Sequence, residues 1–310
     1  MEEALYHPQF GYYSNLKNPI GREGDFYTSS DADPIFGELL ARRFTAMAEE
    51  LNVPAERFTI VEIGAGRGIM ARDILRAQKF PYRILERSGA MRERQRSVLK
   101  GENVEWIDDF PAEFVGCVFS NEFFDALPVH RLIRRDGVLR EIYVDESFCE
   151  VEGDPRPGLD APVAEGQLAD ICVDAKEWIH RIGRSLKAGF HLAIDYGYLD
   201  REFYAHPRGT LMCYWQHQAT ENPYVRIGEQ DITAHVNFSD LIEAGRNASL
   251  LLSEFSTQMN FLIQLGILDV MERLAIAGTA ESIERLQAMK KLILPGNMGE
   301  RFKVLVQRKS

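Results

Sequence analysis

A short segment near residue 60 constrains the fold of this chain more than any other part of its sequence. The apolar run Thr59–Ile63 has the length and composition of a buried parallel strand. Glycines follow at alternate positions, Gly64, Gly66 and Gly68, and the apolar residues of 69–75 then recur at helical spacing. A strand, a glycine turn and a helix in this order begin the α/β folds that bind nucleotides. We therefore expect an α/β protein whose ligand approaches this turn closely, because glycine has no Cβ.

The spacing of these glycines distinguishes two kinds of nucleotide site. The fingerprint of dinucleotide-binding proteins is Gly-x-Gly-x-x-Gly, but Ile69 stands where that fingerprint needs its third glycine. An acidic residue, Glu62, also lies two positions before the first glycine. The pattern Glu-x-Gly-x-Gly-x-Gly resembles motif I of class I S-adenosylmethionine (SAM) methyltransferases, which implies that the carboxylate holds the positive methionine end of the ligand. A tight strand–helix turn without a ligand is the alternative for this segment alone.

Composition narrows the classes of ligand and partner. The chain has 310 residues, of which 45% are hydrophobic and 27% charged, as is usual for globular proteins. Its net charge of −11 argues against a general nucleic-acid binder and is compatible with a cationic ligand or a basic partner protein. It has no run of about 18 apolar residues, so we expect no membrane insertion. The four cysteines lie far apart, which argues against zinc, a disulfide framework or any other metal site and predicts reduced thiols.

Acidic residues also end the next two strands that we expect. Glu86 ends the strand that begins at Tyr82, and it lies 22 positions after Gly64. A carboxylate about 20 residues after the first glycine commonly holds ribose hydroxyls, so Glu86 is the second element of a nucleoside site. Asp108 and Asp109 end a third short strand. In methyltransferases a carboxylate here faces the adenine amino group, although aspartate after a strand is also ordinary turn chemistry.

Two further strand ends supply polar side chains. The buried strand expected over 115–120 ends at Asn121 and Glu122, and the one over 190–194 ends at Asp195 and Tyr196. Ligands of open α/β sheets bind outside the carboxyl ends of the strands, so we expect these residues to line one crevice. Asp125 follows Glu122 by three residues. It could share a helical face with Glu122, or it could cap a helix.

The chain divides into four parts by its pattern. We expect an N-terminal cap and helix over 1–48, a SAM-binding core over 49–198, a pocket-forming insertion over 199–248, and the last core strands over 249–310. Within these parts the pattern predicts a hairpin insertion at 130–152, an amphipathic helix over 167–187 and a helical insertion at 257–292. The aromatic residues of the cap could cover the ligand as a lid or could simply pack on the core; they are Tyr6, Tyr12, Tyr13, Phe26 and Tyr27.

The 199–248 insertion contributes the remaining candidate residues. Alternation over 232–238 predicts a strand with His235 on one face, followed by a helix capped by Ser239. His235 could accept a proton because the histidine pKa lies near neutrality, although a single histidine on a strand is more often structural. Glu229 and Asp231 could help to form an acidic pocket for a cationic side chain, or they could be turn and strand-end residues.

Several blocks outside the glycine turn resemble the MidA family, which includes the mitochondrial methyltransferase that assists assembly of respiratory complex I. The resemblance covers nearly the whole chain, although the family usually has an additional helix before Glu2, which predicts that residues are missing from this N-terminus. The blocks are 4–8 with 11–13, Gly24–Thr28, Phe36–Leu40, Glu62–Gly68, 121–129, Gly228–Val236 and Pro295–Val304.

This resemblance implies a SAM-dependent methyltransferase with a class I, Rossmann-like, mostly parallel sheet, helices on both faces, and insertions after the fifth and sixth strands. It also implies a protein substrate that presents an arginine, possibly in a respiratory complex subunit, and symmetric dimethylation of that arginine. By the same resemblance we expect a cytoplasmic location if the protein is bacterial and the mitochondrial matrix if it is eukaryotic.

The chemistry of methyl transfer assigns roles to these residues. The transfer is an in-line displacement in which the protein mainly positions donor and acceptor. Glu62 and the glycine turn would hold the methionine half of SAM with Asn121 nearby, Glu86 the ribose, and Asp108 or Asp109 the adenine. Glu122 is the first candidate to orient a guanidinium, with Asp125 and His235 as further catalytic candidates. The rival hypotheses are methylation of another side chain or a small molecule, and a non-catalytic SAM-binding assembly factor; Ile69 and Glu62 disfavour an NAD-dependent dehydrogenase.

Overall fold

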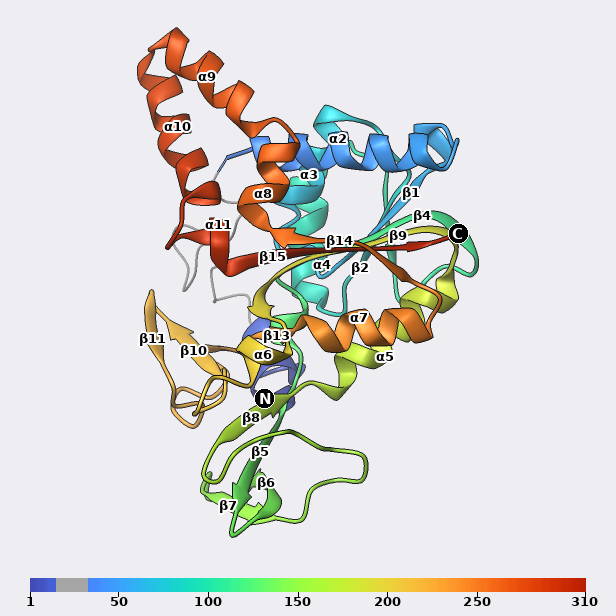
Figure 1. Cartoon of the computed structure of the whole chain (residues 1–310). Coiled ribbons are helices and arrows are strands. Elements are labelled where there is room, and N and C mark those ends of the chain that lie inside the picture. Colours follow the sequence, from blue (N-terminus) through green and yellow to red (C-terminus); the bar gives the residue numbers. More distant parts are fainter. Residues whose placement is uncertain (15–32) are drawn as a thin grey trace.

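A twisted, mostly parallel sheet with helices on both faces forms the body of the protein (Figure 1). The computed structural model describes residues 1–14 and 33–310. The strands of the main sheet, in chain order, are β1 (Thr59–Ile63), β2 (Tyr82–Leu85), β3 (Val104–Ile107), β4 (Phe114–Asn121), β9 (Leu186–Tyr198), β13 (Val236–Asn237), β14 (Leu251–Thr257) and β15 (Phe302–Lys309).

The order of the strands fixes where a ligand can bind. Across the sheet they follow the order β14-β15-β9-β4-β1-β2-β3, and β13 pairs separately with β9. The pairs from β3 across to β9 are parallel, whereas β15 lies antiparallel between β9 and β14. The chain moves outward from β1 to β3 and then returns to β4 on the other side of β1. Ligands of such sheets bind at the carboxyl ends of the strands where this reversal occurs, which here is between β1 and β4.

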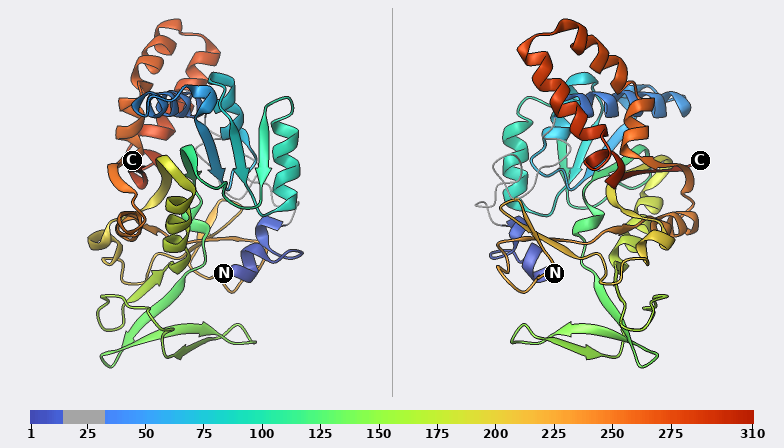
Figure 2. Two further views of the ribbon diagram at one scale, coloured as in Figure 1. Left: turned by 90° about the vertical axis from the view of Figure 1, so that its right-hand side faces the viewer. Right: turned by 60° about the vertical axis from the view of Figure 1, so that its left-hand side comes forward.

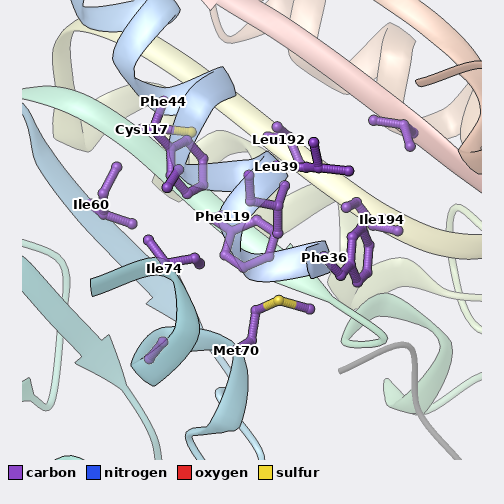
Figure 3. Close-up of a cluster of buried hydrophobic side chains, with 14 of the residues drawn as sticks. Phe36, Leu39, Phe44, Ile60, Met70, Ile74, Cys117, Phe119, Leu192 and Ile194 are labelled. Atoms are coloured by element: carbon purple, nitrogen blue, oxygen red, sulfur yellow. The ribbon is translucent and has the colours of Figure 1, made fainter. Parts of the chain in front are cut away.

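Helices bury both faces of this sheet. On one face α2 packs against α3, and α4 lies beside α3. The apolar stripe of α2 meets Phe119 of β4 and Ile194 of β9 (Figure 3). On the other face, α5 and α7 cover a second apolar cluster that includes Val118. Asp33 lies just before α2, and its Oδ1 accepts the Ile35 N–H at the start of this helix at 2.9 Å. These helices are α2 (Ile35–Glu50), α3 (Ile69–Ala77), α4 (Gly89–Val98), α5 (Val173–Ser185) and α7 (Phe238–Asn247).

A helical insertion separates the last two strands, as expected, and its outer pair of helices projects from the body (Figures 1 and 2). The insertion is interrupted at Gly266 and Gly278, which have φ angles of 88° and 61° that glycine adopts without strain. Arg285 ties the insertion to the start of α2 through two hydrogen bonds of 2.8 and 2.9 Å to the Asp33 carboxylate. The helices are α8 (Gln258–Gln264), α9 (Ile267–Ala277), α10 (Ala280–Ile293) and α11 (Met298–Arg301).

The predicted hairpin near residue 130 belongs to a larger antiparallel sheet that extends away from the main one (Figure 2). The predicted helix over 167–187 is wrong at its start, because residues 168–171 form a strand that pairs with β5 and α5 begins only at Val173. This strand covers the otherwise open edge of β5 and buries Ala169 and Ile171. The strands are β5 (His130–Arg135), β6 (Val138–Val144), β7 (Glu150–Gly153) and β8 (Leu168–Ile171).

The segment after β9 differs from its prediction at two places. The single strand expected over 232–238 is two short strands in different sheets, because the Ala234 N–H leaves the strand pattern and donates to the Asp125 carbonyl at 2.9 Å. The cap of α7 is Asn237, whose side chain accepts the Ser239 N–H at 3.1 Å, so Ser239 lies inside the helix. The other elements of this segment are α6 (Asp200–Phe203), β10 (Met212–Trp215), β11 (Gln218–Thr220) and β12 (Asp231–Thr233).

At the N-terminus, α1 (Glu2–Tyr6) and a short 3-10 turn, Tyr12–Ser14, lie near the carboxyl edge of the main sheet. The sequence block Gly24–Thr28, with Phe26 and Tyr27, lies outside the described residues. Within residues 1–14 and 33–310, no helix is both long and apolar enough to cross a membrane, and no group of three acidic, histidine or cysteine side chains is arranged to hold a metal.

Candidate active site

A cleft of about 870 Å³ opens at the carboxyl edge of the main sheet, where β1, β2 and β4 end. Residues from all three strand ends contribute to its wall, as the order of the strands requires. The sequence-predicted residues in the lining are Glu62, Gly64, Gly66, Glu86, Asp108, Asn121 and Glu122. The sequence-predicted residues outside the lining are Gly68, Asp109, Asp125, Asp195, Tyr196, Glu229, Asp231 and His235.

The three glycines of the turn have different surroundings. All have positive φ angles, 65° at Gly64, 51° at Gly66 and 78° at Gly68, which other residues adopt only with strain. A Cβ at Gly64 would lie 3.0 Å from the Phe123 ring, and one at Gly68 would lie 3.3 Å from Leu99 Cδ1. A Cβ at Gly66 would meet no atom of residues 1–14 and 33–310 within 4 Å. Gly66 therefore offers bare backbone to the open cleft, whereas the other two glycines allow the turn to pack.

Glu62 is buried beneath this turn, with its Oε2 accepting the Tyr82 hydroxyl at 2.9 Å. Burial raises the pKa of Glu62 from 4.5 to about 7; the Tyr82 hydrogen bond opposes this effect, and the negative charge of Glu86 adds to it. A carboxyl group held in this way gains strongly from a cation in the cleft. The amino group of a methionine moiety is such a cation, so this position fits a SAM ligand.

Glu86 is held by donors on both of its oxygens. Its Oε1 accepts the Ser88 N–H at 2.8 Å, and its Oε2 accepts from Gln95 Nε2 at 3.1 Å. Burial raises the pKa of Glu86, while these hydrogen bonds and the charge of Arg92 lower it. Sequence reasoning missed Gln95, although a glutamine within the apolar stripe of Met91 and Leu99 was a signal that its side chain is buried.

The two aspartates after β3 both face arginines. Asp108 lines the cleft and accepts from Arg92 Nη2 at 2.5 Å. Asp109 instead accepts from Arg181 Nη2 at 2.8 Å, and this bond lowers the Asp109 pKa. The Arg181 guanidinium lies 4.4 Å from the centre of the Trp178 ring, and both side chains line the cleft. They were missed from sequence, because their spacing of three residues on a helix is also typical of an ordinary exposed face.

The end of β4 combines an unsatisfied acceptor with a strained backbone. Asn121 donates from Nδ2 to Glu122 Oε1 at 2.9 Å, and its own Oδ1 is buried without a hydrogen-bond partner among the described residues. Glu122 has a φ of 53°, an unusual value for a residue with a side chain. Its N–H donates to the Ile194 carbonyl at 2.9 Å. Strained residues of this kind are common at binding and catalytic sites.

Asp195 and Tyr196 lie below the cleft, where they hold the loop after β4. Asp195 Oδ2 accepts the backbone N–H groups of Phe123, Phe124 and Asp125 at 3.1, 2.9 and 3.4 Å. Burial and the charges of Asp125 and Glu122 raise the Asp195 pKa, and the backbone donors oppose them. Asp125 lies inside a 3-10 turn, Phe124–Ala126, rather than at the start of a helix. Burial raises the pKa of Asp125 to about 6, against a hydrogen bond from Tyr196.

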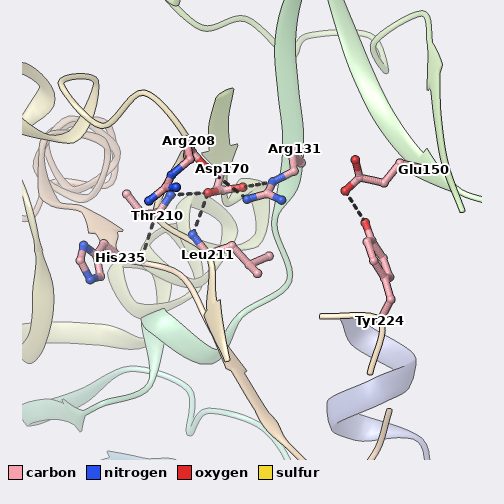
Figure 4. A network of polar contacts seen from close by, with 8 residues as sticks. All are labelled: Arg131, Glu150, Asp170, Arg208, Thr210, Leu211, Tyr224 and His235. Carbon is pink, nitrogen blue, oxygen red and sulfur yellow. Dashed lines mark hydrogen bonds and ion pairs between the residues drawn. The ribbon is translucent and has the colours of Figure 1, made fainter. Parts of the chain in front are cut away.

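The candidates from the 199–248 insertion also lie outside the cleft. Asp231 is buried and accepts the Tyr13 hydroxyl at 2.8 Å, whereas Glu229 is exposed. His235 lies beside a polar network centred on Asp170, and the backbone N–H of His235 donates to Thr210 Oγ1 at 3.2 Å (Figure 4). Burial, with the nearby positive charges, lowers the pKa of His235 to about 4. His235 is therefore neutral at pH 7, and no contact places it at the cleft.

The N-terminal segment supplies one wall of the cleft. Tyr6 and Tyr13 line it, with ring centres 5.6 Å apart, whereas Tyr12 is buried in the core. The Tyr6 hydroxyl donates to the Ala126 carbonyl at 2.8 Å, and the Tyr13 carbonyl accepts the Ser88 hydroxyl at 2.9 Å. These two bonds connect the segment to opposite sides of the cleft. The alternative of packing applies to Tyr12, whereas the alternative of a lid formed by Tyr6 and Tyr13 stays a prediction.

Comparison with known proteins identifies the family to which this arrangement belongs. Residues 39–255 match the family described as "Putative S-adenosyl-L-methionine-dependent methyltransferase". The chain belongs to this family. The match confirms the resemblance inferred from sequence, and SAM is the methyl donor of this enzyme. The site fits SAM: burial raises the pKa of Glu62, so that a cation would stabilise its charged form, and among the described residues Asn121 Oδ1 has no donor and a Cβ at Gly66 would meet no atom within 4 Å.

Individual relatives cover most of the chain. A protein from Burkholderia thailandensis, solved in complex with S-adenosyl-homocysteine, has a TM-score of 0.89 and 32% identity over 99% of this chain and 86% of that one. "Protein arginine methyltransferase NDUFAF7, mitochondrial" from Bos taurus is 31% identical over 98% of this chain and 78% of its own length. The Drosophila melanogaster homologue with the same activity in its name is 28% identical over 77% of this chain, and the match spans 63% of that protein.

Proposed function

We propose that this methyltransferase transfers methyl groups from SAM to an arginine side chain of a protein substrate. The similarity to relatives named protein arginine methyltransferases, at 27–31% identity over nearly the whole chain in the vertebrate proteins, is the observation that carries this proposal. Carboxylates at the end of β4 and behind it, near where the methyl group would leave the donor, also support the proposal. They would attract a guanidinium, because this group is cationic at neutral pH.

The donor half of the site follows from the positions of its carboxylates. Glu62 and the backbone of Gly66 would hold the methionine moiety, with Asn121 Oδ1 accepting from its amino group. Glu86 would accept the ribose hydroxyls, and Asp108 would lie at the adenine end, where Trp178 provides an aromatic surface. When bound, SAM supplies a methyl group on a positive sulfur. The protein's part is to hold that group in line with the acceptor.

Glu122 is the group we assign to the acceptor. A guanidinium nitrogen is a weak nucleophile because its lone pair is delocalised over the planar group. A carboxylate bound to one side of the guanidinium draws positive charge towards itself and leaves another nitrogen free to attack. A bond would form between that nitrogen and the methyl carbon, the carbon–sulfur bond would break with its electron pair left on the sulfur, and the proton that the methylated nitrogen loses would pass to water.

Four residues outside the cleft lining would act on Glu122 or on a cation bound beside it: Asp125, Asp195, Tyr196 and Asp231. Asp195 fixes the loop that carries Glu122, so we assign it a positioning role. Asp125 and Asp231 are buried next to Tyr196 and Tyr13, and their charges favour a cation on the other side of the cleft wall. Exposed Glu229 could meet a basic partner protein. His235 has no part in the step that we propose.

The test is a methylation assay with defined peptides. We would incubate the purified protein with methyl-labelled SAM and a peptide library, with each arginine peptide paired with its lysine version. We expect label only in arginine peptides, and the resemblance above implies symmetric dimethylarginine as the final product. Transfer to lysine peptides, or to small molecules of a cell extract and no peptide, would contradict the proposal.

Two variants separate catalysis from binding. Glu122→Gln should abolish transfer while S-adenosylhomocysteine still binds in a calorimetric titration. The matched control is Glu113→Gln, which changes an exposed glutamate that also has a positive φ, 42°, and lies outside the cleft. If Glu122→Gln still restores function in cells that lack the gene, a non-catalytic assembly role is favoured instead.

The cellular substrate is a further part of the proposal. The vertebrate relatives carry "mitochondrial" in their names, and we propose a respiratory complex subunit as the methyl acceptor, in the cytoplasm of a bacterium or the matrix of a eukaryote. Mass spectrometry of methylarginines in cells with and without the gene would identify it. Unchanged methylarginine in every protein would count against this assignment.

A further inference from the structure

Gln95 is fully buried on α4 although its side chain is polar. Its Nε2 donates to the Gly66 carbonyl at 2.9 Å and to Glu86 Oε2 at 3.1 Å. Its Oε1 accepts from the indole Nε1 of Trp106 at 2.9 Å. One amide therefore connects the glycine turn, the end of β2 and strand β3. Gly66 and Glu86 line the cleft, whereas Gln95 and Trp106 do not.

Trp106 determines which way the Gln95 amide faces. An indole N–H can only donate, so it requires the amide oxygen on its side. The Gly66 carbonyl and the Glu86 carboxylate accept, so they require the amide NH₂ group on the other side. A flipped amide would set oxygen against oxygen and turn the amide NH₂ group, a second donor, towards the indole N–H. Only one orientation satisfies all three neighbours.

This arrangement also determines how Glu86 faces the cleft. The Ser88 N–H binds one carboxylate oxygen and the Gln95 amide binds the other, so the plane of the carboxylate is fixed at two points. Each oxygen keeps a lone pair for a further donor. The two neighbouring hydroxyls of a ribose can supply a pair of donors to such a carboxylate.

We propose that Gln95 is a positioning residue for the carboxylate that binds the ribose, and that Trp106 sets the Gln95 orientation from outside the cleft. The proposal rests on the ribose-binding role given to Glu86 above. It concerns binding of the nucleoside alone, so its test needs no methyl acceptor and is independent of the proposed action on arginine.

The experiment is a calorimetric titration with S-adenosylhomocysteine and with its 2′,3′-dideoxy analogue. The variants are Gln95→Met, which keeps the length of the side chain, and Trp106→Phe, which keeps an aromatic ring but removes the N–H. Each should bind S-adenosylhomocysteine about tenfold more weakly than the wild type, the usual effect of losing one hydrogen bond to a charged group. Trp106→Phe should not change the affinity for the dideoxy analogue, which has no hydroxyls for Glu86 to bind. Gln95→Met should lose less affinity for the analogue than for S-adenosylhomocysteine, because its bond to the Gly66 carbonyl is lost with either ligand.

A matched control and a reference variant accompany these measurements. Arg96→Met removes the exposed guanidinium that lies 5.2 Å from the Trp106 ring but keeps the indole N–H, so both affinities should stay at the wild-type value. Glu86→Gln should weaken binding of S-adenosylhomocysteine and leave the dideoxy analogue unaffected. Equal losses for both ligands in Gln95→Met and Trp106→Phe would show a packing role and overturn the proposal, as would no loss for either. If Glu86→Gln kept the preference for the natural ribose, the proposal would fall with the role of Glu86.

Discussion

The Asp195 carboxylate accepts the backbone N–H of Phe124 at 2.9 Å, and through this bond the fifth parallel strand holds the loop that follows the fourth. The same carboxylate accepts further N–H groups from Phe123, Asp125 and Tyr196. It thus organises the backbone beside Glu122 without reaching the cleft. A residue in this position should affect catalysis by placing Glu122 and should leave the donor site alone.

Asp195→Asn should separate these two effects. The amide offers one oxygen where the carboxylate offers two, so at least one buried N–H loses its partner. We expect a loss of roughly 2–3 kcal/mol in the free energy of unfolding. We also expect kcat for peptide methylation to fall at least tenfold, with the affinity for S-adenosylhomocysteine nearly unchanged. A variant with lowered stability and normal kcat would show that Asp195 has only a structural role.

The raised pKa of Glu62 predicts an unusual dependence of stability on pH. The folded pKa of about 7 exceeds the unfolded value of 4.5, so the folded protein holds this proton more tightly. The contribution of this proton to the free energy of unfolding is therefore fully present below pH 4.5 and is lost as the pH rises through 7. Glu62→Gln removes this dependence, so the variant should gain roughly 3 kcal/mol relative to the wild type between pH 4.5 and 8.

Urea unfolding at pH 4.5 and 8 without ligand measures this difference. Exposed Glu56→Gln serves as the control and should show no such gain. Saturating SAM should reverse the advantage at pH 8, because the positive amino group then stabilises the ionised Glu62 in the wild type only. Parallel pH curves for Glu62→Gln and the wild type would contradict the assignment of Glu62 to the methionine end.

Gly66→Ala and Gly101→Ala form a matched pair. Both glycines have positive φ, 51° and 89°, and a Cβ at either would meet no atom of the described residues within 4 Å. Each substitution should lower the free energy of unfolding by about 1 kcal/mol through backbone strain. Gly66→Ala should in addition weaken S-adenosylhomocysteine binding at least tenfold, because its methyl group enters the cleft. Equal affinities for the two variants would show that no ligand approaches Gly66.

His235→Gln tests whether a histidine takes part in the reaction. Its lowered pKa of about 4 keeps it neutral above pH 5, so it cannot produce a titration near pH 6.5 in the rate. We expect kcat/KM of the variant to stay within about twofold of the wild type from pH 6 to 9. Exposed His217→Gln is the control. A loss of activity confined to His235→Gln, with a changed pH profile, would return this residue to the catalytic group.

The sequence predicted the parts of the site that depend on one strand and its end. Glu62 lies near the end of an apolar run and Glu86 and Asn121 directly follow such runs, and parallel strands bring these ends together whatever the rest of the chain does. The bridge from Trp106 through Gln95 was not predictable, because it joins side chains of two elements whose rotation about their axes depends on packing. The direction of the Asp109 side chain was equally unpredictable, since Arg181 comes close to it only in the folded chain.

Predictions from the local sequence pattern also failed where tertiary contacts interrupt a strand. Residues 232–238 alternate like one strand, but the bond from Ala234 to Asp125 divides them between two sheets. Asp195 was expected to end its strand as Asn121 ends β4, yet β9 continues to Tyr198, and the Asp195 side chain is turned under the neighbouring loop and fully buried. The hydrophobic period and the position in the sequence indicate roughly where a strand ends. The contacts of the next loop decide whether a side chain at that end meets the ligand.

The N-terminal wall of the cleft has a practical consequence for anyone who handles this enzyme. A tag or fusion joined to Met1 would leave the protein next to Tyr6 and Tyr13, where it could hinder exchange of spent cofactor for fresh (Figure 1). The other terminus follows Lys309, which pairs with Gly189 at the opposite edge of the sheet. Immobilisation through Ser310 should therefore leave the entrance accessible, and turnover measured with each terminus attached would test this expectation.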